Sequence, residues 1–339
     1  MEYRVLGKTG LQVSVLGFGC GTVGGLIIRE APRVRVQAVA RAIEAGINYF
    51  DTASMYGDGQ SEIHLGQVLH ELRAEVYVGT KVRLAAADLR DIRGAIQRSV
   101  DASLQRLGRE QVDLIQLHNA IVQLRRAGAT GSVALTTHEV MEEVITAFRQ
   151  LQADGKTRFY GITGVGETAA IQEVMATNLL HTVQVCYSLL NPSAAQAVPR
   201  GFPGQDYGAM LQKAAAHGMG SIGIRVLAAG ALSGQESRHP IAVPSVAPIG
   251  TGPDYRTDVQ RAQAMAVLVQ EGYARDVIEA ALRFACGTPQ LSTALLGCSS
   301  LEHLEHALAA QARGPLPEAA LARLRQIWAR FANGASEPA

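Results

Sequence analysis

Cysteine, aromatic residues and net charge are all scarce in this sequence of 339 residues. Aromatic residues make up 5% of it, and its four cysteines, Cys20, Cys186, Cys286 and Cys298, form no CxxC pair. Each cysteine lies in or beside an apolar run, which is typical of a reduced thiol in a protein core. The sequence therefore argues against a disulfide framework and predicts a cytoplasmic location, where thiols stay reduced.

Long apolar runs and an excess of one charge are also missing. No apolar run reaches the roughly 18 residues that a membrane helix needs, and no signal-peptide core follows Met1-Glu2-Tyr3-Arg4. The net charge is +1, the pI is near 7.8, and lysines and arginines are scattered along the chain. We therefore expect no membrane partner and no nucleic-acid partner, and nothing in the sequence favours one oligomeric state.

Short apolar runs alternate with amphipathic helical stretches along most of the chain. We predict strands at Val15–Gly19, Asn48–Asp51, Val76–Lys81, Val112–His118, Phe159–Thr163, Thr182–Tyr187, Gly220–Arg225 and Leu291–Leu296. The predicted helices are Arg33–Ala45, Ser61–Leu72, Leu89–Leu107, His138–Asp154, Glu167–Met175, Asp206–His217, Ala274–Phe284 and Leu301–Ala312. Eight strands that are each followed by a helix predict an α/β fold of the (β/α)8 TIM-barrel type.

Three further segments frame this barrel, and we predict one domain over residues 1–339. Residues 1–15 are expected to form an N-terminal hairpin around Gly7-Lys8-Thr9-Gly10 that plugs one end. Residues 119–137 and 228–257 exceed what a barrel needs and leave the carboxyl ends of strands, so they should shape the substrate and cofactor pocket. An extra helix, roughly Pro317 to Phe331, should pack on the barrel exterior.

Some motifs suggest other folds or other chemistry. Residues 19–24 match the GxGxxG fingerprint of a Rossmann domain, but residues 25–32 separate them from the next helix, which leaves that fold as the weaker alternative. Tyr77 and Lys81 match the Tyr-x-x-x-Lys pair of short-chain dehydrogenases, yet four residues of a strand span about 13 Å. His303 and His306 have no third ligand in a recognisable pattern, so no metal site is predicted.

Titratable residues stand where three of the predicted strands end. Asp51 ends one strand and Tyr56 follows it in a turn, while Lys81 and His118 end the next two strands. The carboxyl ends of barrel strands meet at one face, so these side chains should converge. An ammonium group stabilises a phenolate, and a tyrosine tuned in this way is a general acid–base for a carbonyl or an alcohol. Reduction of a carbonyl also needs a hydride, which implies a nicotinamide cofactor.

The chain resembles the aldo-keto reductase family in four motifs that occur in the family's order. They are Tyr3-Arg4-Val5-Leu6-Gly7, Phe50-Asp51-Thr52-Ala53-Ser54-Met55-Tyr56-Gly57, Gly79-Thr80-Lys81 and Leu114-Ile115-Gln116-Leu117-His118. The resemblance implies that Tyr56 is the proton donor and that Lys81 and Asp51 tune it. It implies that His118 orients the substrate.

The resemblance also implies a set of cofactor contacts. Those expected near the nicotinamide are Gly21, Thr22, Asp51, Thr163, Gln184 and Tyr187, with the ring of Tyr187 stacked on it. The segment 225–234 resembles the family's diphosphate loop, which implies contacts from Arg225, Leu227, Gly230 and Leu232. The segment 296–306 resembles the adenosine-phosphate signature, which implies contacts from Gly297, Ser299 and His303.

The position of Ser299 bears on the choice between NADP and NAD. Family members that favour NADP often have Arg or Lys there, so the serine leaves either cofactor open and leans modestly towards NAD. We predict an NAD(P)-dependent oxidoreductase that interconverts a small-molecule carbonyl and an alcohol. The alternatives are an NAD-preferring sugar or polyol dehydrogenase and a cofactor-binding regulatory subunit without significant turnover.

Overall fold

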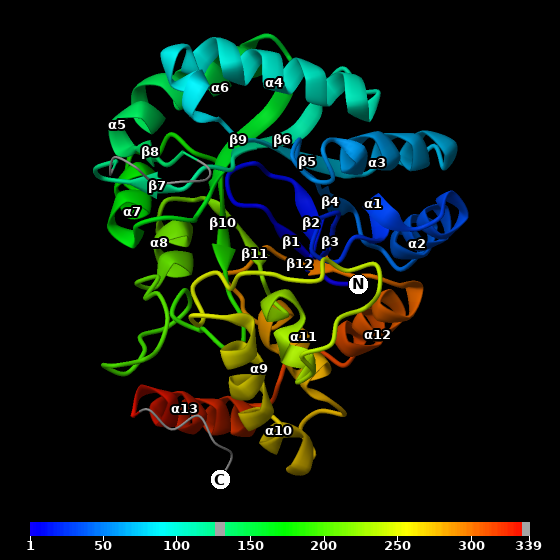
Figure 1. Cartoon of the computed structure of the whole chain (residues 1–339), viewed down its shortest axis with the longest axis vertical. Helices are drawn as coiled ribbons and strands as arrows, with labels where there is room; N and C mark the ends of the chain where they lie inside the picture. Colours follow the sequence, from blue (N-terminus) through cyan, green and yellow to red (C-terminus); the bar gives the residue numbers. More distant parts are fainter. Residues whose placement is uncertain (126–132, 334–339) are drawn as a thin grey trace.

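A closed barrel of eight parallel strands forms the centre of the computed structural model, which describes residues 1–125 and 133–333. Around the barrel the strands are β3 (Leu16–Gly19), β4 (Tyr49–Asp51), β5 (Tyr77–Val82), β6 (Val112–Leu117), β9 (Thr157–Thr163), β10 (Thr182–Cys186), β11 (Gly220–Ile224) and β12 (Thr293–Gly297). The barrel closes where β12 pairs with β3 (Figure 1). This closed sheet confirms the predicted (β/α)8 class and excludes the open Rossmann sheet.

Helices surround the barrel. They are α2 (Pro32–Glu44), α3 (Gln60–Glu71), α4 (Ile92–Leu107), α6 (Ile145–Ala153), α7 (Thr168–Ala176), α8 (Met210–Ala216), α11 (Val277–Cys286) and α12 (Leu301–Ala312). The longest of these, α4, shows how the sequence specifies them. The Asp91 side chain caps its first turn by accepting a 3.0 Å hydrogen bond from the Gly94 amide, and Gly108 ends it in a left-handed conformation. Its buried residues recur every three or four positions, so one face packs on the barrel.

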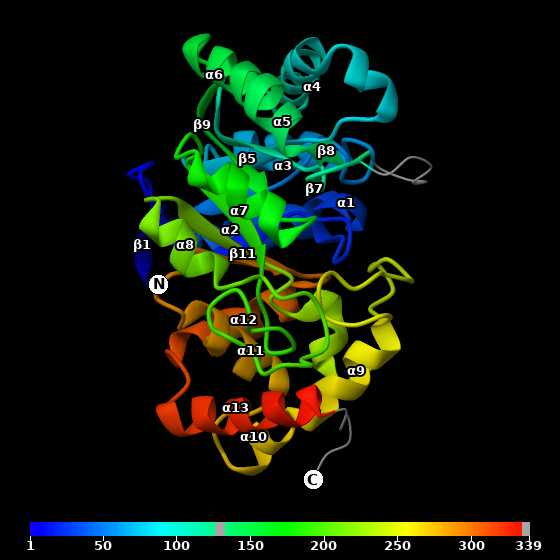
Figure 2. The same ribbon diagram turned by 90° about the vertical axis from the view of Figure 1, so that its left-hand side faces the viewer.

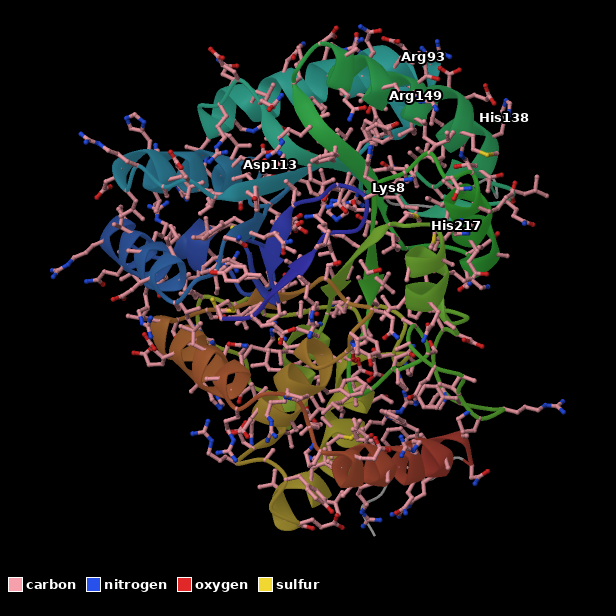
Figure 3. The ribbon with its side chains drawn as sticks, turned by 180° about the vertical axis from the view of Figure 1, so that it is seen from behind. Lys8, Arg93, Asp113, His138, Arg149 and His217 are labelled. Atoms are coloured by element: carbon pink, nitrogen blue, oxygen red, sulfur yellow. The ribbon has the colours of Figure 1, made fainter. Side chains whose placement is uncertain are left out.

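The N-terminal hairpin lies over the amino ends of the barrel strands. Its strands are β1 (Tyr3–Val5) and β2 (Gln12–Ser14), and the turn between them is bonded to residues 218–219 (Figure 3). Gly7 approaches the barrel so closely that a Cβ there would lie 2.1 Å from the Gly220 nitrogen, so a larger residue would displace the hairpin. The buried residues of this layer are Leu6, Leu11, Val13, Tyr49, Leu114, Ile222 and Leu295. The hairpin therefore plugs this end, as predicted.

The extra helix at the C-terminal side, α13 (Glu318–Ala332), packs outside the barrel next to α10 (Val267–Gln270) (Figures 1 and 2). Leu324, Trp328 and Phe331 are buried, and the Trp328 indole N–H donates a 2.8 Å hydrogen bond to the Leu189 carbonyl. Trp328 is thus a packing residue. None of the helices in the described part of the chain is long and apolar enough to cross a bilayer.

Several boundaries differ from the sequence prediction for identifiable reasons. The expected helix 206–217 begins only at Met210, because Gly208 and Ala209 both have positive φ angles. The expected helix 138–154 consists of α5 (Thr137–Glu139), a π-helical turn at Val140–Val144, and α6.

The two loops that exceed what a barrel needs contain short elements of secondary structure. Residues 119–137 include β7 (Ile121–Val122) and β8 (Leu135–Thr136), which pair in parallel. Residues 126–132 of this loop lie outside the described residues. Residues 228–257 begin with a 3₁₀ segment at Ala228–Ser233 and run into α9 (Tyr255–Ala264).

Candidate active site

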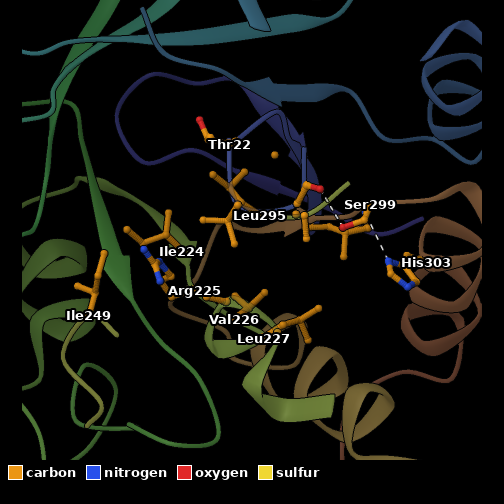
Figure 4. Close-up of a pocket in the computed structure, with 18 of the residues that line it drawn as sticks. Thr22, Ile224, Arg225, Val226, Leu227, Ile249, Leu295, Ser299 and His303 are labelled. Atoms are coloured by element: carbon orange, nitrogen blue, oxygen red, sulfur yellow. Dashed lines mark hydrogen bonds between the residues drawn. The ribbon is translucent and has the colours of Figure 1, made fainter. Parts of the chain in front are cut away.

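A pocket of about 810 Å³ lies at the carboxyl ends of the barrel strands. Asp51, Tyr56 and His118 line its deep part, and Gly297, Ser299 and His303 line it where β12 leads into α12. Arg225 and Ile249 lie on one side of the pocket, with Ser299 and His303 on the other (Figure 4). Barrel enzymes carry their chemistry at this face, so the pocket is the candidate active site.

Lys81 and Asp51 form a buried ion pair beneath the pocket. In the register of β4 and β5, Asp51 lies opposite Gly79, and Lys81 follows two residues later on the same side of the strand. The Lys81 ammonium donates a hydrogen bond to Asp51 Oδ1. It donates a second one, of 2.7 Å, to the Thr52 carbonyl. Asp51 Oδ2 accepts a 2.7 Å hydrogen bond from the amide of Gln184. The ammonium is thereby fixed in one position.

Burial and the charge of the partner shift the pKa of each residue of this pair in opposite directions. Burial lowers the pKa of Lys81, but the attraction of Asp51 and Tyr56 outweighs it, so the pKa is raised. Burial raises the pKa of Asp51 despite Lys81 and the Gln184 hydrogen bond, which lower it. The ammonium therefore stays charged at neutral pH.

Tyr56 lies next to this ammonium. Its hydroxyl is 3.5 Å from Lys81 Nζ, and the ring centroid is 4.9 Å from the same nitrogen. Burial raises the pKa of Tyr56, and Lys81 lowers it without cancelling the effect of burial. The phenol is consequently protonated at neutral pH, as a proton donor must be, and Lys81 is the main group that eases its ionisation.

His118 faces Tyr56 from the end of β6. The two ring centroids are 5.7 Å apart and the ring planes are nearly perpendicular. Burial, together with the charges of Lys81 and Arg83, lowers the pKa of His118 to about 3. The imidazole is therefore neutral across the physiological range. Its buried Nδ1 has no hydrogen-bond partner in the described structure, and neither has the buried Thr163 Oγ1 on the same pocket wall.

Most of the expected cofactor residues line this one pocket. They are Gly21, Thr22, Asp51, Thr163, Gln184, Arg225, Leu227, Gly230, Gly297, Ser299 and His303. Tyr187 and Leu232 are both buried and do not line it. The Tyr187 ring stacks on Phe284 at 4.9 Å, and its hydroxyl is 3.0 Å from the Thr288 hydroxyl. Neither Tyr187 nor Leu232 is thus brought to the pocket wall, and their contacts to a cofactor stay predictions.

Strand alternation explains the position of Tyr187. Gln184 faces the pocket from β10, and a residue three positions later points to the other side. The side chain that does face the pocket from the neighbouring strand is Ile224, the last residue of β11. Sequence reasoning missed Ile224, although its place at a strand end was a usable signal.

Ser299 is already hydrogen-bonded within the chain. Its hydroxyl donates to the Gly24 carbonyl at 2.8 Å, and its backbone N–H donates to His303 Nδ1 at 3.3 Å. The Ser300 side chain caps α12 by accepting from the His303 N–H. The Ser299 hydroxyl, the Ser299 N–H and His303 Nδ1 thus already have partners within the chain.

A loop that follows the 3₁₀ segment closes over the pocket. The Val243 N–H donates to the Val23 carbonyl at 3.2 Å, and the Arg29 guanidinium donates to the Ile241 and Thr22 carbonyls. The Arg238 guanidinium donates to the Val243 and Ala229 carbonyls at 2.7 and 2.8 Å. Residues from opposite sides of the pocket are therefore linked across it.

The fold and this pocket together are those of a family of barrel oxidoreductases. The model of the aldo/keto reductase family matches residues 15–329, and the chain belongs to that family. An aldo-keto reductase from Bacillus halodurans, solved in its holo form, superposes with a TM-score of 0.68 at 24% identity, covering 99% of this chain and 97% of that one. At 24% sequence identity, this similarity shows that the two proteins share a fold and nothing more specific.

Similar curated proteins differ in what their names state. L-galactose dehydrogenase of Arabidopsis thaliana is 28% identical over 318 residues, which is 91% of this chain and 88% of that protein. A putative voltage-gated potassium channel subunit beta of Schizosaccharomyces pombe is 27% identical over 323 residues, 90% of this chain and 86% of that protein. Pyridoxal 4-dehydrogenase of Microbacterium luteolum is 30% identical over 212 residues, 51% of this chain and 58% of that protein.

Proposed function

We propose that the protein is an NAD(P)-dependent oxidoreductase that interconverts a small carbonyl compound and its alcohol. The observation that carries this proposal is the 3.5 Å separation of Lys81 Nζ and Tyr56 Oη, with the ammonium held by Asp51. A protonated phenol beside a fixed cation in a pocket is equipped to protonate a carbonyl oxygen as charge develops on it. We further propose that the 339 residues act as one domain in a reducing cytoplasm, which the four buried free cysteines support.

Each residue has a separate part in the reaction. Tyr56 donates the proton to the oxygen, or accepts it in the oxidative direction. The neutral imidazole of His118 donates a hydrogen bond that orients the same oxygen. Lys81 stabilises the phenolate that remains after proton transfer. A nicotinamide cofactor supplies or accepts the hydride when it is bound.

The pocket residues fit such a cofactor. Thr163 Oγ1 is a buried hydroxyl that has no hydrogen-bond partner among the described residues, at the place where the resemblance puts a contact to the carboxamide. A buried polar atom of this kind is normally hydrogen-bonded, which supports a ligand contact there. The Gln184 amide nitrogen donates one hydrogen bond to Asp51, so its second N–H and its carbonyl oxygen remain for a ligand.

An assay for turnover tests the proposal directly. Aldehydes, ketones and sugars are screened with NADH and NADPH, and their alcohols with NAD and NADP, while nicotinamide absorbance is followed. Turnover that depends on Tyr56 supports the proposal. Cofactor binding without turnover of any compound would favour a regulatory subunit, the function that the name of the Schizosaccharomyces pombe relative suggests.

A sugar dehydrogenase that prefers NAD is the second candidate function. Two observations favour it: one relative over most of the chain is named L-galactose dehydrogenase, and the Ser299 hydroxyl is bonded to Gly24. The two functions share the site and differ in the alcohol oxidised and in the cofactor.

Replacing Ser299 with arginine should tighten NADP binding selectively. A charge-assisted hydrogen bond contributes about 1.5–3 kcal/mol, so Ser299→Arg should lower the Kd for NADP about 10- to 100-fold and leave that for NAD nearly unchanged. Fluorescence titration of both cofactors measures this. Ser299→Ala is the matched control, and its NADP affinity should stay close to wild type because the hydroxyl already serves Gly24. A wild-type preference for NADP above about a thousandfold would contradict the assignment.

A further inference from the structure

The charged side chains around the pocket are almost all positive. Arg83, Arg225 and Arg238 line it, and its only carboxylate among the described residues is Asp51, which is paired with Lys81. Arg238 is held by the Val243 carbonyl of the covering loop and by the Ala229 carbonyl of the 3₁₀ segment. Arg83 and Arg225 remain as cations near the reacting residues, and neither forms an ion pair within the described chain.

Arg225 is the more confined of the two. It follows the last residue of β11, and its φ angle of 58° is unusual for a residue with a side chain. Its guanidinium makes one hydrogen bond, to the Ala247 carbonyl at 3.2 Å. A guanidinium has five N–H donors, so most of them have no protein partner among the described residues. No carboxylate of the described residues forms an ion pair with Arg225, although a buried charge usually has such a partner.

Asp258 is a carboxylate whose charge acts on Arg225. One of its oxygens accepts a hydrogen bond from the Thr251 hydroxyl at 2.5 Å, and within the described residues it forms no ion pair with Arg225. Arg225 lines the same pocket as Tyr56, and its charge favours ionisation of the Tyr56 hydroxyl. Ser299 and His303 lie across the pocket from Arg225 (Figure 4).

Arg83 adds a second positive charge at the same end. It follows β5, is exposed, and lies close enough to His118 for its charge to act on the imidazole. Within the described part of the chain, its guanidinium hydrogen-bonds to the sulfur of Met55, at 3.1 Å. The pocket is also lined by apolar side chains, among them Met55, Val165, Ile224 and Ile249.

We propose that Arg225, supported by Arg83, binds an anionic group of the substrate, so that the substrate is a carbonyl compound or alcohol with an apolar body and one carboxylate or phosphate. This inference rests on the proposed oxidoreductase function. A guanidinium matches the planar, two-oxygen edge of a carboxylate and also binds phosphate. The apolar side chains of Val165, Ile224 and Ile249 suit the carbon skeleton of the substrate, and the two guanidinium groups suit its charged end, which favours an oxo acid or hydroxy acid over a neutral sugar.

Matched substrate pairs test the inference. Each pair has a charged and a neutral member: 4-carboxybenzaldehyde with 4-methylbenzaldehyde, succinic semialdehyde with butanal, and glyceraldehyde 3-phosphate with glyceraldehyde. In each pair whose anion the site accepts, we expect the charged member to have a kcat/KM about 10- to 100-fold higher than the neutral member. An increase in the carboxylate pairs identifies a carboxylate site, and an increase in the phosphate pair identifies a phosphate site. Equal values in all three pairs would overturn the inference.

Substitutions test whether Arg225 is the residue that binds the anionic group. Arg225→Met should bring the ratio of charged to neutral kcat/KM close to one, and Arg225→Lys should restore part of it because the charge returns without the planar fork. Arg149→Met is the control, since it removes the same charge from the exposed outer face of α6 (Figure 3), and it should leave the ratio unchanged. If Arg225→Met weakens NAD(P) binding and leaves the ratio intact, Arg225 serves the cofactor diphosphate and the inference is wrong.

A binding measurement separates this inference from the proposed function. If no carbonyl compound is turned over, the function fails, and calorimetric titration with terephthalate still reports on the anion site. Binding to the wild type that weakens at least tenfold in Arg225→Met would support the anion site. Absence of binding, or equal binding to both proteins, would overturn it.

Discussion

Replacing Tyr56 with phenylalanine is expected to lower kcat for carbonyl reduction by about 10²–10⁴. The change removes the hydroxyl that lies 3.5 Å from the Lys81 ammonium and keeps the ring that packs near His118. The carbonyl oxygen then loses its proton donor, while the pocket keeps its shape. Steady-state kinetics at saturating cofactor measure the loss.

The matched control for this variant is Tyr77→Phe. Tyr77 begins β5 on the strand that carries Lys81, and it does not line the pocket. We expect Tyr77→Phe to turn over substrate like the wild type, and both variants to bind cofactor with unchanged Kd. If Tyr56→Phe keeps wild-type turnover, another group protonates the substrate and the proposed role of Tyr56 is wrong.

The convergence of the four titratable residues could be predicted because it depends on one regular feature. Asp51, Lys81 and His118 each lie at the end of a strand or directly after it, and parallel strands in a barrel bring such ends together. The hairpin and the outer helices were predictable for the same kind of reason, because local periodicity and turn residues specify them.

The differences between expectation and structure depend on features that local patterns do not contain. The resemblance implies that Tyr187 faces the cofactor, whereas in the structure its side chain follows β10 and stacks on Phe284. The positive φ angles of Arg225, Ala228 and Ala229 reshape the loop after β11, and no sequence rule predicts them for residues other than glycine, asparagine or aspartate. The bond from Ser299 to Gly24 joins positions 275 residues apart. Such contacts follow from closure of the barrel.

Electrostatics is the other property that required the structure. The sequence indicated that Lys81 would lower the pKa of Tyr56, and it does, but the burial that raises this pKa was not foreseeable. The same burial, with two nearby cations, makes His118 a neutral hydrogen-bond donor instead of a titrating acid. Each of these effects depends on how much water the completed pocket excludes.

Replacing Lys81 with methionine is expected to abolish activity near neutral pH although Tyr56 remains. The ammonium lowers the pKa of Tyr56, so its loss should raise that pKa further. The sign of the shift makes oxidation of the alcohol the more sensitive direction, because the phenolate that accepts the proton becomes rarer at any given pH. Initial rates in both directions from pH 6 to pH 10 measure it, and the oxidative rate should recover only at higher pH than in the wild type.

The Lys81→Met variant also leaves Asp51 as an unpaired buried carboxylate, so a second variant is needed to separate catalysis from folding. Breaking a buried ion pair costs about 3–5 kcal/mol, and chemical denaturation should show this loss in the single variant. The double variant Asp51→Asn/Lys81→Met carries no unpaired charge and should regain much of that stability while staying inactive, because the group that eases ionisation of Tyr56 is still missing. If the double variant has the activity and the pH profile of the wild type, another group lowers the pKa of Tyr56. If the single variant Lys81→Met is as stable as the wild type, Asp51 is protonated or solvated once Lys81 is gone.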